Sequence, residues 1–184
     1  SGPIFEQVLA GCAACHGLDG RSNDGETPRL RAQNYDYLVN QITRFAALQP
    51  GSDDPVFRGL DTIRNRHSAT MAQSASDLDL ATVRNLARYF ATLPCETGVN
   101  AATLPTPPEG TAWCNDCHDP KKARSMTNVP ILNAQNADYL ERQLLTFKGA
   151  AATIDHQSVR LHHFMTRSVR TMSETRIREV AEYY

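Results

Sequence analysis

Cys12-Ala13-Ala14-Cys15-His16, near the start of the chain, recurs as Cys114-Asn115-Asp116-Cys117-His118 at an offset of 102 residues. Each stretch holds two cysteines three positions apart, and a histidine directly follows the second cysteine. The sequence around the two stretches also repeats, which indicates that one unit has been duplicated. At the same offset Pro28, Leu30, Ala32, Gln33, Asn34, Asp36, Tyr37, Leu38, Gln41 and Phe45 match Pro130, Leu132, Ala134, Gln135, Asn136, Asp138, Tyr139, Leu140, Gln143 and Phe147.

The repeat continues after Phe45, but there the offset falls to 94 because the second copy is shorter. At this offset Met71 aligns with Met165. The segment between the copies is rich in Pro, Thr, Ala and Gly, a composition that predicts an extended linker. We therefore expect a first domain over residues 1–94, a linker over residues 95–108 and a second domain over residues 109–184.

Apolar residues in both copies follow a helical period. Leu38, Ile42 and Phe45 recur at i, i+4 and i+7, and the second copy repeats this stripe. Strand-like alternation is nowhere sustained, so the predicted fold is all-α, with two tandem domains. Further helices are expected over residues 3–11, after a cap at Asp77 as far as Phe90, and from near Ser173 to Tyr184.

Two thiols three residues apart, with an imidazole directly after them, are the attachment signature of a c-type haem. A histidine that binds iron needs an acceptor for its other ring N–H, commonly a backbone carbonyl. In each copy a proline that could supply this carbonyl lies twelve residues after the histidine. We therefore expect two covalently bound haem c groups. The predicted residues are Cys12, Cys15, Cys114 and Cys117 for attachment, His16 and His118 as iron ligands, and Pro28 and Pro130 for the carbonyls.

Two other uses of paired cysteines, a zinc site and a thioredoxin-like redox pair, fit the sequence less well. A zinc site would place its two Cys-x-x-Cys pairs roughly 15–20 residues apart in one small unit, whereas here they are about a hundred residues apart. A thioredoxin-like redox pair would need a βαβ context, which the helical periodicity contradicts. Covalent haem attachment is the interpretation that fits both copies.

The second axial ligand of each iron has to come from elsewhere in the unit. Met71 is the only methionine of the first unit, and Met165 aligns with it, so these two are the predicted ligands. Met172 aligns with an apolar helix position and is expected in the core, while Met126 aligns with no ligand position. A histidine ligand would hold the iron at a lower potential than methionine does. The rival histidines, for which we prefer a solvent-facing or propionate-bonding role, are His67, His156, His162 and His163.

Composition excludes several classes of protein. The 184 residues carry 19 Lys and Arg against 20 Asp and Glu, and neither half has the basic excess of a nucleic-acid binder. No apolar run approaches the roughly 20 residues that span a bilayer. No leader segment is recognisable, and we expect Ser1-Gly2-Pro3 to be a remnant.

The chain resembles the cytochrome c4 family of dihaem cytochromes c over almost its whole length. The resemblance rests on the motif at 12–20, on Pro-x-Leu-x-x-Gln at 28–33 and 130–135, and on the paired methionines. It implies two class I cytochrome folds packed face to face. We expect the haems to meet near the domain interface, with Gln33, Tyr35 or Tyr37 and their counterparts near propionates. One departure is Asp119-Pro120, where the family has a Gly-rich turn.

The resemblance also implies a periplasmic electron carrier between a quinol-oxidising complex or dehydrogenase and a terminal oxidase or reductase. Such a carrier has no catalytic residues, and it meets the membrane only through its redox partner proteins. The alternatives are a dihaem redox enzyme, of the peroxidase or thiosulfate dehydrogenase type, and a cytochrome subunit of a dehydrogenase complex. Catalysis would need an open iron position. Cys95, outside the repeat, is a conceivable thiolate ligand, but we expect a partly buried linker thiol.

Overall fold

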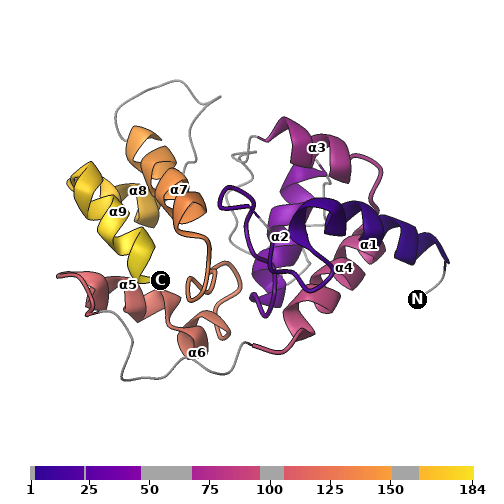
Figure 1. Cartoon of the computed structure of the whole chain (residues 1–184), viewed down its shortest axis with the longest axis horizontal. Coiled ribbons are helices and arrows are strands. Elements are labelled where there is room, and N and C mark those ends of the chain that lie inside the picture. Colours follow the sequence, from indigo (N-terminus) through magenta and orange to yellow (C-terminus); the bar gives the residue numbers. More distant parts are fainter. Residues whose placement is uncertain (1–2, 23, 47–67, 96–105, 151–161) are drawn as a thin grey trace.

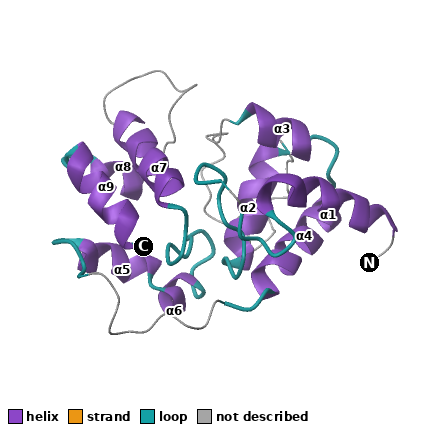
Figure 2. Cartoon of the chain, viewed as in Figure 1, coloured by secondary structure: helices purple, strands orange, loops and turns teal. Residues whose placement is uncertain are grey.

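The computed structural model describes residues 3–22, 24–46, 68–95, 106–150 and 162–184. Within these ranges every regular element is a helix, joined by loops and turns (Figure 2). None of these helices combines the length and the apolar character needed to cross a bilayer. The helices are α1 (Pro3–His16), α2 (Tyr35–Phe45), α3 (Ala69–Ala75), α4 (Leu80–Thr92), α5 (Thr111–His118), α6 (Pro120–Ala123), α7 (Ala137–Ala150), α8 (His163–Val169) and α9 (Glu174–Tyr183).

The helices form two groups, α1–α4 and α5–α9, that lie next to each other (Figure 1). Each group has its own apolar core. The first core packs α1, α2 and α4 around Phe90 and Leu86, both 1% exposed. The second core packs α7 and α9 around Leu140 and Ala181. The duplication seen in the sequence is therefore a duplication of a helical domain.

Helices α2 and α9 form where the sequence predicts them. α2 buries Leu38 and Val39, and Asn34 caps its first turn by accepting a hydrogen bond from the N–H of Asp36. In the second domain α9 begins after Ser173, whose side chain accepts from the N–H of Arg176. The α2 and α9 predictions are therefore confirmed.

Two helix boundaries differ from the predictions. α1 does not end at residue 11 but continues through the first cysteine motif to His16. The motif contains no helix breaker, and the chain leaves the helix only at Gly17, which has a φ of +75°. The cap of α4 is Asp79 and not Asp77, because Oδ1 of Asp79 accepts from the N–H of Thr82 at 2.7 Å.

Two loops meet between the domains and are called here the first strap (residues 24–34) and the second strap (residues 126–136) (Figure 1). Each strap contains, two residues before its end, a residue with positive φ, Ala32 at 54° and Ala134 at 60°. The N–H of each donates to the last turn of its own domain, Ala32 to the Phe90 carbonyl and Ala134 to that of Tyr184. Both straps are thus anchored in the same way on their C-terminal helices.

Candidate haem sites

The first cysteine motif occupies the last turns of α1. Cys12, Cys15 and His16 are related by i, i+3 and i+4, so they share one face of the helix. Neither cysteine forms a disulfide, and Cys12 is half-buried while Cys15 is exposed. Burial raises the pKa of the Cys12 thiol. Two thiols and an imidazole are therefore presented side by side.

The ring of His16 is held in one orientation. Its Nδ1 lies 2.9 Å from the carbonyl oxygen of Pro28. A carbonyl only accepts, so Nδ1 carries the proton and Nε2 keeps its lone pair for a metal. Burial lowers the pKa of His16, which favours the neutral ring, although the Pro28 carbonyl acts in the opposite direction.

The second motif repeats this arrangement on α5. The Nδ1 of His118 lies 2.8 Å from the carbonyl oxygen of Pro130. Cys114 is half-buried and Cys117 exposed, like their counterparts, and burial raises the pKa of Cys114. One geometry therefore occurs twice, with each histidine held by the strap of its own domain.

Met71 and Met165 occupy equivalent places in the two domains. Each is the third residue of a short helix, α3 or α8, and each is half-buried. The N–H of Met71 donates to Oγ of Ser68 at 3.2 Å, and that of Met165 donates to Nδ1 of His162 at 3.4 Å. The backbone of both methionines is thus fixed by the residue that caps its helix.

The other candidates lie elsewhere. His162 and His163 are exposed, and His162 is used as a helix cap. Met172 packs against the second core, as predicted. Met126 is 37% exposed. The expectation of a partly buried Cys95 is wrong, because the thiol is exposed beyond the end of α4. His67 and His156 fall outside the described residues.

The residues present fit a haem with its carboxylates. Two buried donors, Nε of Arg29 and Nε of Arg31, have no hydrogen-bond partner among the residues that the structure describes. Both arginines belong to the first strap, one and three residues after the proline that holds His16. A buried cationic N–H needs an acceptor, and a haem propionate is an anionic acceptor of matching charge. The donor set of each motif, two thiols and an imidazole held through its Nδ1, completes the fit.

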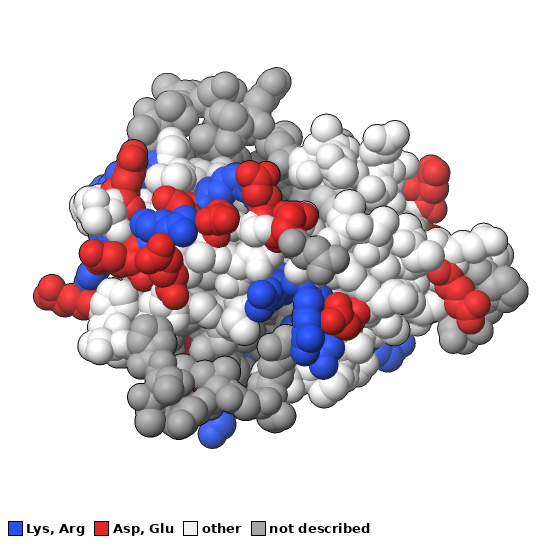
Figure 3. All heavy atoms as spheres, in the orientation of Figure 1, with Lys and Arg blue, Asp and Glu red and all other residues white. Residues whose placement is uncertain are grey.

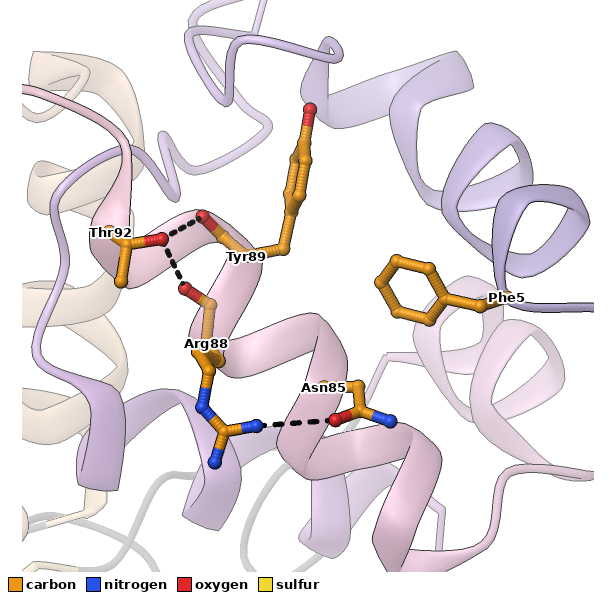
Figure 4. Close-up of a pocket in the computed structure, with 5 residues that line it drawn as sticks. All are labelled: Phe5, Asn85, Arg88, Tyr89 and Thr92. Atoms are coloured by element: carbon orange, nitrogen blue, oxygen red, sulfur yellow. Dashed lines mark hydrogen bonds between the residues drawn. The ribbon is translucent and has the colours of Figure 1, made fainter. Parts of the chain in front are cut away.

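A separate cavity of about 320 Å³ is lined by residues of the first domain (Figure 4). It lies between α1 and α4, where Phe5 faces Tyr89 and Thr92. Its polar groups are largely engaged, since Arg88 donates to Asn85 and Thr92 donates to the carbonyl of Arg88. None of its lining residues belongs to a cysteine motif, so this cavity is no part of the candidate sites.

Charge is distributed unevenly over the face seen in Figure 3. Acidic and basic side chains gather over the α5–α9 domain, whereas most of the α1–α4 domain is uncharged in this view. Within the α5–α9 domain Arg178 pairs with Asp138 and Glu141 at 2.7 Å and with Glu182 at 2.6 Å.

Comparisons with known proteins agree with this geometry. No protein-family model matches the chain. Cytochrome c4 of Azotobacter vinelandii is 30% identical over 156 residues, which cover 78% of this chain and 70% of that protein. Cytochrome c4 of Thiocapsa roseopersicina is 28% identical over 184 residues, which cover 94% and 84%. The chain belongs to the cytochrome c4 family.

Solved structures show the same fold. Reduced cytochrome c4 from Pseudomonas stutzeri superposes with a TM-score of 0.68 at 23% identity, covering 100% of this chain and 96% of that one. A thiosulfate dehydrogenase of Marichromatium purpuratum superposes with a TM-score of 0.66 at 22% identity, but the match covers only 39% of that chain. The predicted all-α fold of two tandem class I cytochrome domains is confirmed.

The predicted cofactor is confirmed as well. Members of the cytochrome c4 family are dihaem c-type cytochromes, and both attachment motifs are present here. This family member therefore carries two covalently bound haem c groups and functions in electron transfer.

The sequence did not reveal what the straps do across the domain interface. The amide of Gln33 bonds to the backbone of Ile131, and that of Gln135 bonds to the backbone of Arg29. Asn34 and its counterpart Asn136 likewise donate to carbonyls of the opposite strap. The signal that could have shown this is the repeated Ala-Gln-Asn triplet at 32–34 and 134–136.

Proposed function

We propose that this chain is a periplasmic electron carrier in which each domain holds a six-coordinate iron. His16 and Met71 bind the iron of the first domain, and His118 and Met165 bind that of the second. We place the domains at residues 1–94 and 109–184, with residues 95–108 as the linker. The observation that carries the proposal is the repeated geometry: a buried histidine held by a proline carbonyl, and a methionine in the same place of an equivalent helix.

The haem supplies a one-electron couple between ferric and ferrous iron when bound. The protein's part is to hold the ligands still in both states. The Pro28 carbonyl fixes the ring of His16, and the cap at Ser68 fixes the backbone that carries Met71. Fixed ligands keep reorganisation small, and two protein ligands leave no site where oxygen or peroxide could react. The same features argue against the enzyme alternative, which needs an open position.

The proposed partners are redox proteins: a quinol-oxidising complex or a dehydrogenase as donor, and a terminal oxidase or reductase as acceptor. One relative, 31% identical over 160 residues, is the thiosulfate dehydrogenase electron acceptor of Thiomonas intermedia. A thiosulfate dehydrogenase is therefore the first donor to test. Contacts with such partners should be small and transient, as redox encounters are.

The ligand assignment can be tested by the optical spectrum of the oxidised protein. Methionine ligation gives a charge-transfer band, and we expect Met71→Ala and Met165→Ala each to remove about half of its intensity. Met172→Ala and Met126→Ala are the matched controls and should leave the band unchanged. Loss of the band in Met172→Ala, with its retention in Met165→Ala, would overturn the assignment in the second domain.

The carrier function can be tested with purified components. The holoprotein alone should not be reduced by thiosulfate, and it should be reduced once a thiosulfate dehydrogenase is added. Reduction of the protein by thiosulfate in the absence of the added dehydrogenase would contradict the carrier proposal and favour the enzyme alternative. Rapid turnover of peroxide would do the same.

A further inference from the structure

Two glutamines join the domains in a reciprocal way. Nε2 of Gln33 donates to the Ile131 carbonyl at 2.9 Å, and the N–H of Ile131 donates to Oε1 of Gln33 at 2.7 Å. In the same way Nε2 of Gln135 donates to the Arg29 carbonyl at 2.9 Å, and the N–H of Arg29 donates to Oε1 of Gln135 at 2.7 Å. Each amide therefore closes a pair of hydrogen bonds with one residue of the opposite strap.

The clamped residues have a special position. Arg29 directly follows Pro28, so its N–H belongs to the same peptide unit as the carbonyl that holds His16. Ile131 follows Pro130 in the same way, and that peptide holds His118. A peptide unit is planar. One end of each unit is thus bonded to the domain's own histidine, and the other end to the glutamine of the opposite domain.

A hydrogen bond at the N–H end of a peptide also acts on its carbonyl end. Accepting from the N–H polarises the amide and makes its carbonyl a stronger acceptor. A stronger acceptor holds the histidine N–H more firmly and makes the ring a more basic ligand. A more basic ligand favours the ferric state. The glutamine can therefore influence both the orientation and the basicity of a histidine that it does not touch.

The glutamines are themselves well fixed. Gln33 is only 6% exposed, and its Oε1 also accepts from the N–H of Asn34 at 2.8 Å. Oε1 of Gln135 accepts from the N–H of Asn136 at 2.9 Å in the same way. A side chain held at this many points has little freedom to follow a moving strap, so it can resist displacement of the peptide.

We propose that Gln135 is a positioning residue for His16 and that Gln33 is a positioning residue for His118. Each domain thereby sets the properties of the iron ligand in the other domain. This inference rests on the proposed function, because it requires the two histidines to be iron ligands. Its consequence is crossed: a change in the second domain acts on the first haem, and a change in the first domain acts on the second haem.

The test is a pair of variants, Gln135→Leu and Gln33→Leu, made in the holoprotein and followed by potentiometric titration. In Gln135→Leu the potential of the haem attached at Cys12 and Cys15 should rise, while the other potential stays unchanged. In Gln33→Leu the haem of the second domain should respond instead. The two waves are assigned with the methionine variants, and exchange of the ring N–H of His16 should quicken in Gln135→Leu alone.

A matched control removes another hydrogen bond from the same interface. Asn40 donates to Asn128 across the domains, a bond that involves neither the Pro28–Arg29 nor the Pro130–Ile131 peptide. Asn128→Ala should therefore leave both potentials unchanged. If either leucine variant does not fold, Gln135→Asn and Gln33→Asn keep an amide on a shorter chain and should give the same crossed pattern with smaller shifts.

The outcomes separate this inference from the proposed function. Two low-spin haems with no crossed shift, or with equal shifts of both potentials, would overturn the inference and leave histidine–methionine ligation intact. A shift confined to the haem of the mutated domain would overturn it as well. A wild-type spectrum without the low-spin histidine–methionine signature would overturn the proposed function itself.

Discussion

The two domains leave their cysteine motifs by different routes. In the first, the chain turns at Gly17 and Gly20, with φ values of +75° and +70°. In the second, Asp119 has an ordinary φ of −54° and caps the short helix α6 through Lys121 and Lys122. The departure from the family's Gly-rich turn is thus a replacement of one turn by another. A duplicated fold keeps the positions of its ligands while the connections between them change.

The largest expected effect comes from breaking the glycine turn. A Cβ at Gly20 would lie 2.8 Å from the N of Arg31 and 3.1 Å from the Phe90 ring, at a φ that L residues rarely adopt. We expect Gly20→Ala to lower the free energy of unfolding by about 2 kcal/mol or more. Urea unfolding of the holoprotein, followed by circular dichroism, measures this.

The control for that variant lies in the other domain. Lys122 occupies the position aligned with Gly20, and its side chain is 52% exposed in an ion pair with Asp116. Lys122→Ala should change the unfolding free energy by less than about 1 kcal/mol. An equal loss of unfolding free energy in Gly20→Ala and Lys122→Ala would contradict the difference between the two turns.

The second comparison concerns the last aromatic residue of each core. Phe90 is 1% exposed, whereas the aligned Tyr184 reaches Asn115 with its hydroxyl at 2.6 Å. Ala13 stands where Asn115 would be, so Phe90→Tyr buries a hydroxyl with no partner and should cost about 1–3 kcal/mol. Adding Ala13→Asn should restore part of this loss. A double variant no more stable than Phe90→Tyr would contradict the equivalence of the two cores.

Much of this architecture could be predicted because it depends on short stretches of sequence. The cysteine motifs need only five residues, and the apolar stripe of α2 needs one helical face. Because the unit is repeated, a prediction for one copy also applies to the other. Met165 and not Met172 is the predicted ligand because it aligns with Met71. Such features depend on neighbours in the sequence and not on how the domains dock.

The features that the sequence did not reveal depend on docking or on close alternatives. Gln33 is a polar residue in a loop, and its partner Ile131 becomes visible only when the straps meet. Asp77 and Asp79 are both good cap residues two positions apart, and only the backbone geometry selects Asp79. The helix of the first motif runs on to His16 because its stop signal is Gly17, after the motif and not before it.

The third comparison concerns the caps before the two methionines. Ser68 caps α3, and His162 takes the same place before α8. Serine is among the strongest capping residues and histidine is not. We therefore expect Ser68→Ala to destabilise by about 1 kcal/mol and His162→Ser to stabilise by about 0.5 kcal/mol. On heating, the methionine charge-transfer band should be lost at a lower temperature in Ser68→Ala than in the wild type, and at a higher temperature in His162→Ser. A band in His162→Ser that is lost before that of the wild type would contradict this.

The smallest expected effect on stability is a dependence on pH that Asp79 has and its aligned residue, Ser173, lacks. Both residues cap a C-terminal helix, but only the aspartate titrates. The hydrogen bond from the N–H of Thr82 lowers the pKa of Asp79 below its ordinary value of 3.8. The folded state thus holds the proton less tightly than the unfolded chain. The stability that this cap contributes is present above pH 3.8 and is lost as the pH falls through the lowered pKa.

Exchanging the two caps isolates this contribution from that of all other carboxylates. Asp79→Ser keeps a cap without a titrating group, so the difference in Tm between this variant and the wild type should favour the wild type near neutral pH and shrink below pH 3.8. Ser173→Asp should show the opposite trend, because it adds a titrating cap to α9. A Tm difference that stays constant across this range would mean that Asp79 does not hold its helix as a carboxylate. The pH dependence, more than the size of the shift, therefore decides whether the two domains differ here.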